Sequence, residues 1–332
     1  MKQHSLQSWF KSGAPGVWMS AGAVSIAVIM TIGLLLMIGI RGLGYFWPAD
    51  LVQARYQIPG QEARLIVGEL VQEEEVSRAR LKGAGFPVAE DGPEFMTRDL
   101  IKVGNREVYG SDFSWVIGEW LTEHSYPTDL VALERREWGN FYGYIVSVKE
   151  SGKVIAEGEA AWPVLQERLA RVNHLAEKLA TLEKKDISAI NHGLERLRLQ
   201  TRKLELEGRL DATAQADIDA ERAALEARYQ ALEGELVSLH GEVDRDSLVV
   251  REVGGEEKES SLGKLVKALQ PNNMSVFAKL GTYFSNLWSF LSDDPREANT
   301  EGGIFPAIFG TVMMTMLMAI IVTPFGVLAA VY

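Results

Sequence analysis

The sequence predicts a membrane protein, mainly α-helical, in which two transmembrane helices flank a soluble α+β domain. Two long runs without a charged residue lie near the two ends of the sequence, and the residues between them change from a strand-like alternation to a helical period. Charge-free runs of this length are typical of membrane spans. The change of period predicts a small antiparallel β unit with an inserted antiparallel coiled-coil hairpin.

The two charge-free runs predict transmembrane helices over residues 17–40 and 304–332. As a helix, the first run would be about 36 Å long at roughly 1.5 Å per residue, against a hydrocarbon core of about 30 Å. It exceeds the apolar core of a secretory signal peptide, and the IGIRGLGYFW that follows has no small-residue cleavage motif. We therefore expect it to be retained as an anchor.

The distribution of charge predicts the topology. The sequence has 34 Lys and Arg and 45 Asp and Glu, and of these only Lys2 and Lys11 lie outside residues 41–301, which therefore carry 32 basic (34 less 2) and 45 acidic residues. Short basic segments tend to stay in the cytoplasm. Residues 1–16 are thus expected to form a cytoplasmic tail and residues 41–301 a periplasmic domain, in a multi-pass protein of the bacterial inner (plasma) membrane.

Composition excludes several classes of function. The net charge of −11 argues against a nucleic-acid partner, for which a basic surface is expected. The chain has no cysteine, which excludes disulfides, thiolate metal sites and cysteine nucleophiles.

The β unit is predicted over about residues 64–158 and 247–253. Alternating and β-branched or aromatic runs such as ARLIVGELV and GNFYGYIVSVKESGKVIAEG are separated by Gly and Asn turn signals, which indicates an antiparallel sheet or barrel. Hairpins are expected at Val103–Arg106 and at Lys149–Lys153. The SLVVREV run at 247–253 predicts a further strand of the same unit.

A helical hairpin is predicted over about residues 162–241. Apolar residues with 3-4 spacing form two seams, at Ile187, Ile190, Leu194, Leu197, Thr201 and Leu204, and at Ile218, Leu225, Tyr229, Leu232, Leu236 and Leu239. Gly208 interrupts the period between the seams, and Asp211 is expected to cap the returning helix. An earlier stripe (Leu165, Val172, Leu179) is one residue out of phase with the first seam, which predicts a bend near residues 184–186.

An amphipathic helix is predicted over about residues 274–291, with Phe277, Leu280, Phe284, Leu287, Trp288 and Leu291 on one face. Two interpretations remain open. The helix lies on the outer membrane surface with Tyr283 and Trp288 as interfacial anchors, or it packs on the soluble domain. Its closeness to the second span favours the membrane.

The sequence contains no recognisable catalytic centre. Its histidines (His4, His124, His174, His192 and His240) are scattered, no HExxH or Walker-type glycine loop occurs, and acidic clusters such as Glu73–Glu75 lack the pattern of calcium loops. No catalytic residue, metal site or cofactor is therefore expected.

The second span and its approach carry a specific pattern. A Gly-Gly-Ile-x-Pro-Ala-Ile-x-Gly-Thr start is followed by a Pro-x-Gly-Val-x-Ala-Ala-x-Tyr finish. This pattern resembles the first core helix of PstA-type permease subunits of bacterial phosphate ABC importers, in members with a long periplasmic insert. The positions that carry the resemblance include Gly302, Gly303, Pro306, Gly310, Thr311, Pro324, Gly326, Ala329, Ala330 and Tyr332.

The resemblance implies a membrane-spanning permease component of an ATP-driven phosphate importer. Such a component moves inorganic phosphate into the cytoplasm by alternating access, and ATP is hydrolysed by a partner, so the chain itself would not be an enzyme. The implied partners are a second permease subunit, an ATPase subunit pair, a periplasmic phosphate-binding protein and membrane lipid. Family permeases continue with further helices and a coupling loop, so the sequence is expected to match the front part of such a subunit, with the core incomplete.

The alternative is an interaction protein of the periplasm, either an adaptor or a sensor-like receptor, anchored by two transmembrane helices. A helical hairpin inserted in a β domain is also typical of membrane-fusion adaptors. Pro324 favours transport, because it removes a backbone hydrogen bond deep in the span and neighbouring helices must compensate for the loss.

Overall fold

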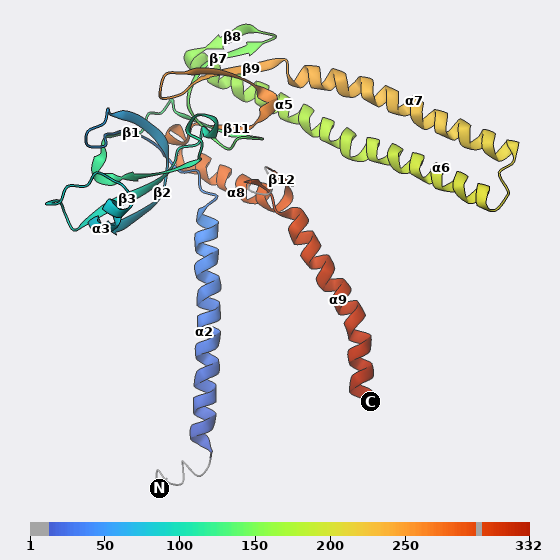
Figure 1. The fold of residues 1–332 in the computed structure, drawn as a ribbon, viewed down its shortest axis with the longest axis horizontal. Helices are drawn as coiled ribbons and strands as arrows, with labels where there is room; N and C mark the ends of the chain where they lie inside the picture. Colours follow the sequence, from blue (N-terminus) through green and yellow to red (C-terminus); the bar gives the residue numbers. More distant parts are fainter. Residues whose placement is uncertain (1–12, 297–300) are drawn as a thin grey trace. The chain divides into compact units, whose positions relative to one another are not determined.

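The structure is a computed structural model of the 332-residue chain, and it describes residues 13–296 and 301–332. The chain divides into two compact units (Figure 1). The helical unit comprises Met1–Pro48, Ser275–Pro295 and Gly302–Tyr332, and the α+β unit comprises Ala49–Met274 and Arg296–Glu301. The coarse prediction is confirmed, since apolar helices near both ends of the sequence flank an α+β region with antiparallel sheets.

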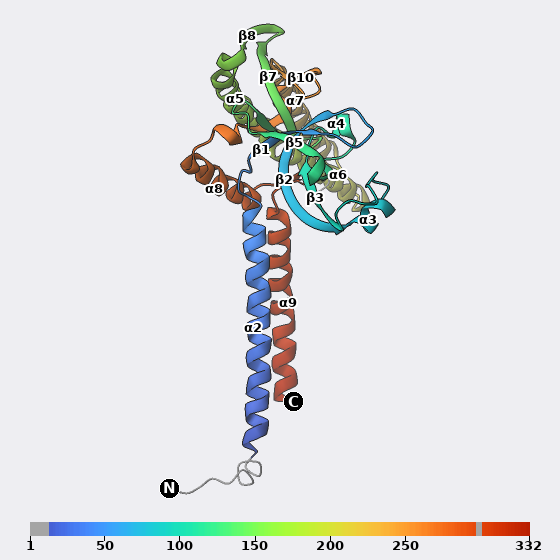
Figure 2. The ribbon, with the colours of Figure 1, turned by 90° about the vertical axis from the view of Figure 1, so that its left-hand side faces the viewer.

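The helical unit contains α2 (Ala14–Gly44), α8 (Val276–Ser292) and α9 (Phe305–Val331). In the part of the chain that the structure describes, two helices are long and apolar enough to cross a membrane, Gly16–Gly44 and Phe305–Val331. Both run without a break (Figure 2). The expected cytoplasmic tail, 1–16, falls largely outside the described residues.

One sheet of the α+β unit has the strand order β4-β3-β2-β1-β5. Its strands are β1 (Leu51–Tyr56), β2 (Arg64–Ser77), β3 (Phe95–Lys102), β4 (Phe113–Ile117) and β5 (Leu121–Ser125). Strand β2 pairs with β1 through its first half and with β3 through its second half, so it joins the two ends of the sheet. Val52, Ala54 and Tyr56 alternate along β1 and bury the face that the period of a strand predicts.

A second sheet has the order β10-β9-β7-β6-β11, and β8 pairs with the free part of β7. Its strands are β6 (Val131–Arg135), β7 (Phe141–Glu150), β8 (Lys153–Glu157), β9 (Asp246–Arg251), β10 (Glu257–Ser261) and β11 (Leu265–Leu269). Because β9 returns to pair with β7, the helices between β8 and β9 connect two neighbouring strands of this sheet.

The predicted bounds of the β unit, 64–158 and 247–253, are too narrow at both ends. Strand β1 precedes them, and β10 and β11 follow them. The polar EKESS of β10 lies on the edge of its sheet, where a strand needs no apolar alternation. The sequence pattern therefore gives no sign of this strand. The sequence predicted one antiparallel sheet or barrel, whereas these strands form the two sheets described above.

The hairpin at Lys149–Lys153 is confirmed. The strands on either side of Val103–Arg106 also pair antiparallel, but their connection is longer than expected and spans residues 103–112. Between β3 and β4 the chain forms a short helix, α4 (Arg106–Tyr109), preceded by the buried Asn105 in the left-handed region. The Asn105 amide donates to the Tyr142 carbonyl and accepts from the Tyr142 N–H, both at 3.0 Å, so it substitutes for a strand partner of β7. In the β7–β8 turn, Ser151 and Gly152 both have positive φ.

The insertion is a pair of helical arms (Figure 1). The outgoing arm comprises α5 (Ala161–Thr181), the π-helix η3 (Leu182–Ile187) and α6 (Ser188–Leu206), and the returning arm is α7 (Ala212–Val243). Asp211 caps α7 as predicted, because its Oδ1 accepts from the Ala214 N–H at 2.7 Å. Ile190 and Leu197 are buried on one arm and Ile218 and Leu239 on the other, whereas Tyr229, expected in the seam, is exposed.

The π-helix explains the change of phase between the two predicted stripes. A π-turn holds one more residue than an α-turn, so the residues after it are displaced by one position around the helix. The stripe of Leu165 and Val172 therefore continues at Ile187 and not at residue 186. Residues 184–186, where the sequence predicted a bend, lie within this π-helix.

The core of the second sheet is formed with α5. Leu165, Leu169 and Val172 pack against Val148 of β7 and Leu248 of β9. A smaller cluster of Leu51, Val67, Leu130 and Tyr142 joins the two sheets. The remaining short elements are α3 (Arg78–Gly83), η1 (Gly118–Trp120), η2 (Gly158–Ala160), η4 (Leu262–Lys264), η5 (Pro271–Asn273), β12 (Pro295–Arg296) and β13 (Glu301–Gly302).

Candidate functional site

The residues that carry the family resemblance lie in and just before α9, at its two ends. Gly302, Gly303, Pro306, Gly310 and Thr311 surround the start of the helix. A second group lies towards the other end of the helix and comprises Pro324, Gly326, Ala329, Ala330 and Tyr332. The distance along the helix from Pro306 to Pro324 is about 27 Å, at roughly 1.5 Å per residue. The structure thus does not bring them together in one pocket.

The two glycines close the connection between α8 and α9. Gly302 has φ +86°, a conformation that other residues rarely adopt. Gly303 is buried, and a Cβ atom there would lie 2.1 Å from the carbonyl oxygen of Asp293. Beside this contact the Gly303 N–H donates to the Asp294 carbonyl at 3.2 Å, and the Ile304 N–H donates to the Phe290 carbonyl at 2.8 Å. The connection therefore requires glycine for two separate reasons.

The proline in the first turn of α9 costs the helix no hydrogen bond. Pro306 is the second helical residue, where a backbone N–H would have no partner within the helix. The Ala307 and Ile308 N–H groups both donate to the Ile304 carbonyl, at 3.1 and 3.0 Å. Pro306 therefore fixes where the helix begins.

Ala307, Gly310 and Thr311 form a strip of small residues on one face of α9. A Cβ atom added to Gly310 would meet no atom within 4 Å. The Thr311 hydroxyl donates back to the Ile308 carbonyl at 2.8 Å, so its polar group is satisfied inside its own helix. Strips of this kind let the backbone of another helix approach closely.

Pro324 interrupts the hydrogen bonds of α9 from within. It has no N–H to donate to the carbonyl of Ile320, four residues earlier. The preceding Thr323 donates its hydroxyl to the Ala319 carbonyl at 2.5 Å and so does not replace the missing bond. Beyond it, Gly326 has open space around its Cα, and Ala329 and Ala330 continue a second group of small residues.

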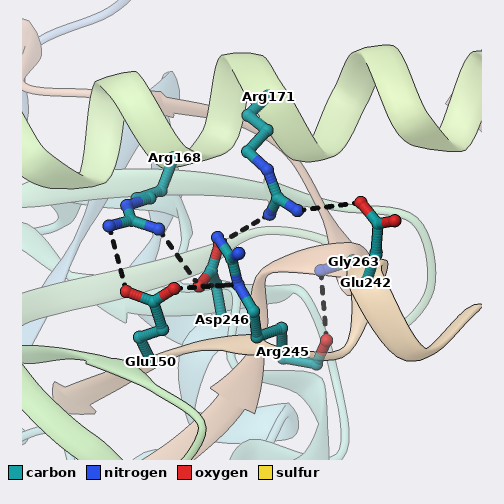
Figure 3. Close-up of polar contacts among 8 residues, drawn as sticks. Glu150, Arg168, Arg171, Glu242, Arg245, Asp246 and Gly263 are labelled. Carbon is teal, nitrogen blue, oxygen red and sulfur yellow. Dashed lines mark hydrogen bonds and ion pairs between the residues drawn. The ribbon is translucent and has the colours of Figure 1, made fainter. Parts of the chain in front are cut away.

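A cluster of charged side chains, which the sequence patterns do not reveal, anchors the helical arms to the second sheet (Figure 3). Asp246 of β9 has a fully buried side chain that contacts Arg168 at 3.7 Å, Arg171 at 3.1 Å and Arg245 at 3.2 Å. Glu150 pairs with Arg168 and with Arg245, both at 3.1 Å.

The same cluster extends to α7, whose Glu242 pairs with Arg171 at 3.1 Å. Its members come from α5, α7, β7 and β9, and Arg245 lies in the two-residue connection between α7 and β9. The hydrogen bond to Asp246 is the main cause that raises the pKa of Arg245. Three guanidinium groups face three carboxylates, so the formal charges cancel and every arginine of the cluster is paired. The cluster is suited to fixing the base of the helical arms rather than to binding an anion.

A second polar cluster surrounds Glu107 of α4. Its Oε1 accepts from Arg135 at 2.8 Å and from Lys258 at 2.7 Å. Burial on its own would raise the pKa of Glu107, but the hydrogen bonds from Lys258 and Arg135 outweigh burial and hold this pKa below its ordinary value. Arg135 also donates to the carbonyls of Trp138 and Gly139 and so holds a turn in which both residues have positive φ.

No group of three or more His, Asp or Glu side chains with metal-binding geometry occurs among residues 13–296 and 301–332. His240 pairs loosely with Glu183 across the helical arms at 3.7 Å, and His4 falls outside the described residues. No family model matches this chain, and no significant similarity to a curated protein or to a solved structure is found. The family resemblance therefore rests on the residues of α9 and its approach alone.

Proposed function

We propose that this chain is a membrane-embedded permease component of an ATP-driven importer that moves inorganic phosphate into the cytoplasm. The observation that carries the proposal is the pattern of α9, in which two glycines, two prolines and two groups of small residues match the first core helix of PstA-type permeases. In the structure, Gly303 and Pro306 each have a separate physical reason to be the residue they are, and Gly310 leaves open space on its face of the helix.

The exposure of α9 supports a role among other transmembrane helices. The side chains on both sides of Pro324 are exposed, including Ile320, Ile321, Phe325 and Leu328. In hydrocarbon, a carbonyl that has lost its helical donor costs several kcal/mol unless a neighbouring helix supplies one. A helix with this defect is therefore expected to lie inside a bundle, as the core helix of a permease does.

Under this proposal the phosphate pathway would lie among other helices, because the only basic residue of the two spans is Arg41 in the last turn of α2. Residues 17–40 and 305–331 contain no Lys or Arg. An anion crossing the membrane needs compensating cations. These cations would come from helices other than the two spans, in keeping with a second permease subunit, and ATP would be hydrolysed by an ATPase pair on the cytoplasmic side. A periplasmic phosphate-binding protein would deliver the substrate to the α+β unit.

Uptake of radiolabelled phosphate by cells that express this gene tests the proposal. Inactivating the gene should lower ATP-dependent uptake, and the wild-type gene should restore it. Gly310→Phe fills the strip that a neighbouring helix needs and should not restore uptake. Met316→Phe lies outside the strip, about 120° around the helix from Gly310 at roughly 100° per residue, and should restore it. Unchanged uptake after inactivation, or equal uptake by the two variants at equal protein level, contradicts the proposal.

A second candidate function is that of a periplasmic interaction protein. The helical arms favour it, because Leu199, Leu206 and Val237 are exposed on them, with 59%, 75% and 68% of their surface accessible. Under this function, deletion of residues 162–241 would abolish partner binding, and inactivating the gene would leave phosphate uptake unchanged. The uptake experiment therefore separates the two candidates.

A further inference from the structure

Helix α8 exposes a continuous apolar stripe. Phe277, Leu280, Phe284, Trp288 and Leu291 follow one another at intervals of three or four residues and so lie on one face of the helix. Phe277, Phe284 and Trp288 are 86%, 63% and 71% exposed. Exposed aromatic side chains in a row of this length mark an interaction surface.

A second face of α8 is attached to the end of α2. The Phe46 ring lies 5.0 Å from the Phe290 ring and 6.5 Å from the Tyr283 ring, measured between centroids. The Asn286 amide donates to the Phe46 carbonyl at 3.2 Å, and Trp47 lies 6.3 Å from Tyr283. These contacts join α8 to the residues that directly follow the first apolar helix.

The C-terminal end of α8 is attached to the start of α9. The Phe290 carbonyl accepts from the Ile304 N–H at 2.8 Å, one residue before α9 begins. Phe290 therefore contacts the end of one apolar helix through its ring and the start of the other through its backbone. Helix α8 is held where α2 ends and α9 begins, which is the level of the membrane surface if both helices span.

We infer that α8 is an interfacial helix whose exposed stripe is buried in the boundary between lipid headgroups and acyl chains. The occupant of the stripe is the bilayer, because α8 belongs to the same compact unit as two helices long and apolar enough to span, and Phe290 contacts the end of one and the start of the other. Aromatic side chains are favoured at this depth.

The charge of α8 defines the kind of lipid surface it fits. Its one ionisable cation is Lys279, which is 8% exposed and lies outside the stripe, and the helix has no acidic residue. Binding through the stripe is thus independent of lipid charge, unlike that of a basic amphipathic helix. Tyr283 contacts the α2 end and does not belong to the exposed stripe.

Site-specific fluorescence on the full-length chain tests this inference, and the lack of cysteine makes single-cysteine variants free of background. The chain is reconstituted into phosphatidylcholine vesicles and labelled with the environment-sensitive dye NBD at one of three positions. Phe284→Cys reports on the stripe, Ser285→Cys is the matched position about 100° around the same helix, and Ile29→Cys reports on the middle of α2. Phe284 is exposed, so its replacement removes little packing within the protein.

Lipids that carry a nitroxide near the headgroup should quench the Phe284 probe severalfold more strongly than the Ser285 probe. Replacing a third of the phosphatidylcholine with anionic lipid should leave this difference unchanged. The inference would be overturned if the Phe284 and Ser285 probes were quenched equally and weakly. If nitroxides near the acyl-chain ends still quenched the Ile29 probe, the membrane span itself would stand. A blue-shifted but unquenched Phe284 probe would also overturn it, because the stripe would then be covered by protein.

Discussion

The carbonyl oxygen of Asp293 occupies the space that a side chain at Gly303 would need, since a Cβ atom there would lie 2.1 Å from it. This close approach lies at the junction between α8 and α9. It gives a structural reason for one of the two glycines with which the family-like pattern begins. Gly302, with its positive φ, supplies the reason for the other.

Gly303→Ala should therefore destabilise the junction. The backbone at Asp293 cannot move away as a flexible side chain would, so we expect a loss of about 1–3 kcal/mol, as is usual for overpacking. Gly310→Ala is the matched control, because the added methyl meets open space and alanine favours the helix. Thermal unfolding in nonionic detergent and cleavage of the α8–α9 connection by protease should both distinguish the variants. Equal behaviour of the two would rule out the close approach.

Asp246→Ala should destabilise the α+β unit strongly. It removes the buried carboxylate that Arg168, Arg171 and Arg245 share, and breaking a buried ion pair from one side costs about 3–5 kcal/mol. Glu242→Ala removes a half-exposed member of the same cluster and should cost less than about 1 kcal/mol. Urea unfolding followed by circular dichroism measures both. Similar losses for the two variants would show that Asp246 does not anchor the arms.

The Glu107 cluster should make stability depend on pH in a defined direction. The pKa of Glu107 is lowered in the folded state, so its contribution is fully present above the unfolded value of about 4.5 and is lost as the pH falls through the folded value. Wild type should therefore lose more stability than Glu107→Gln below about pH 4.5. At neutral pH the variant should be less stable by about 1–3 kcal/mol, because two cations lose their acceptor. Parallel pH profiles would contradict this role of Glu107.

Leu197→Asp should open the helical arms, whereas Leu199→Asp should not. Leu197 is 3% exposed between α6 and α7, and Leu199 is 59% exposed on the same helix. A carboxylate in the place of Leu197 would be buried without a partner, at a cost of several kcal/mol. Limited proteolysis of the full-length chain should show faster cleavage within residues 161–243 for the first variant alone. Equal protection of both would mean that the arms do not depend on this contact.

The helices were more predictable than the sheets, for physical reasons. A helical period extends over many residues, and even the one-residue change of phase after Leu179 left a signal that the π-helix explains. Strand β10 is polar, so it carries no apolar alternation by which to identify it. Strand β1 does alternate, at Val52, Ala54 and Tyr56, but it lies before the predicted bounds of the β unit, which begin at residue 64. The β3–β4 connection depends on a bond between Asn105 and Tyr142, which are far apart in the sequence.

The site residues were predictable only where a local backbone rule applies. Pro306 in the first turn and Pro324 inside the helix follow from the chemistry of proline itself. The Asp246 cluster was missed because its members come from four different elements. Its only local trace is Arg168 and Arg171, three residues apart on one face of α5.

Cysteine accessibility across the inner membrane tests most directly whether α2 and α9 cross it with the α+β unit on the periplasmic side. In the cysteine-free chain, Ser151→Cys lies in the exposed β7–β8 turn, and Ser8→Cys lies in the tail before the first apolar helix. A membrane-impermeant maleimide added to intact spheroplasts should label the first variant and not the second, and permeabilisation should expose both. Labelling of Ser8→Cys with protection of Ser151→Cys, or labelling of both before permeabilisation, would contradict the proposed topology.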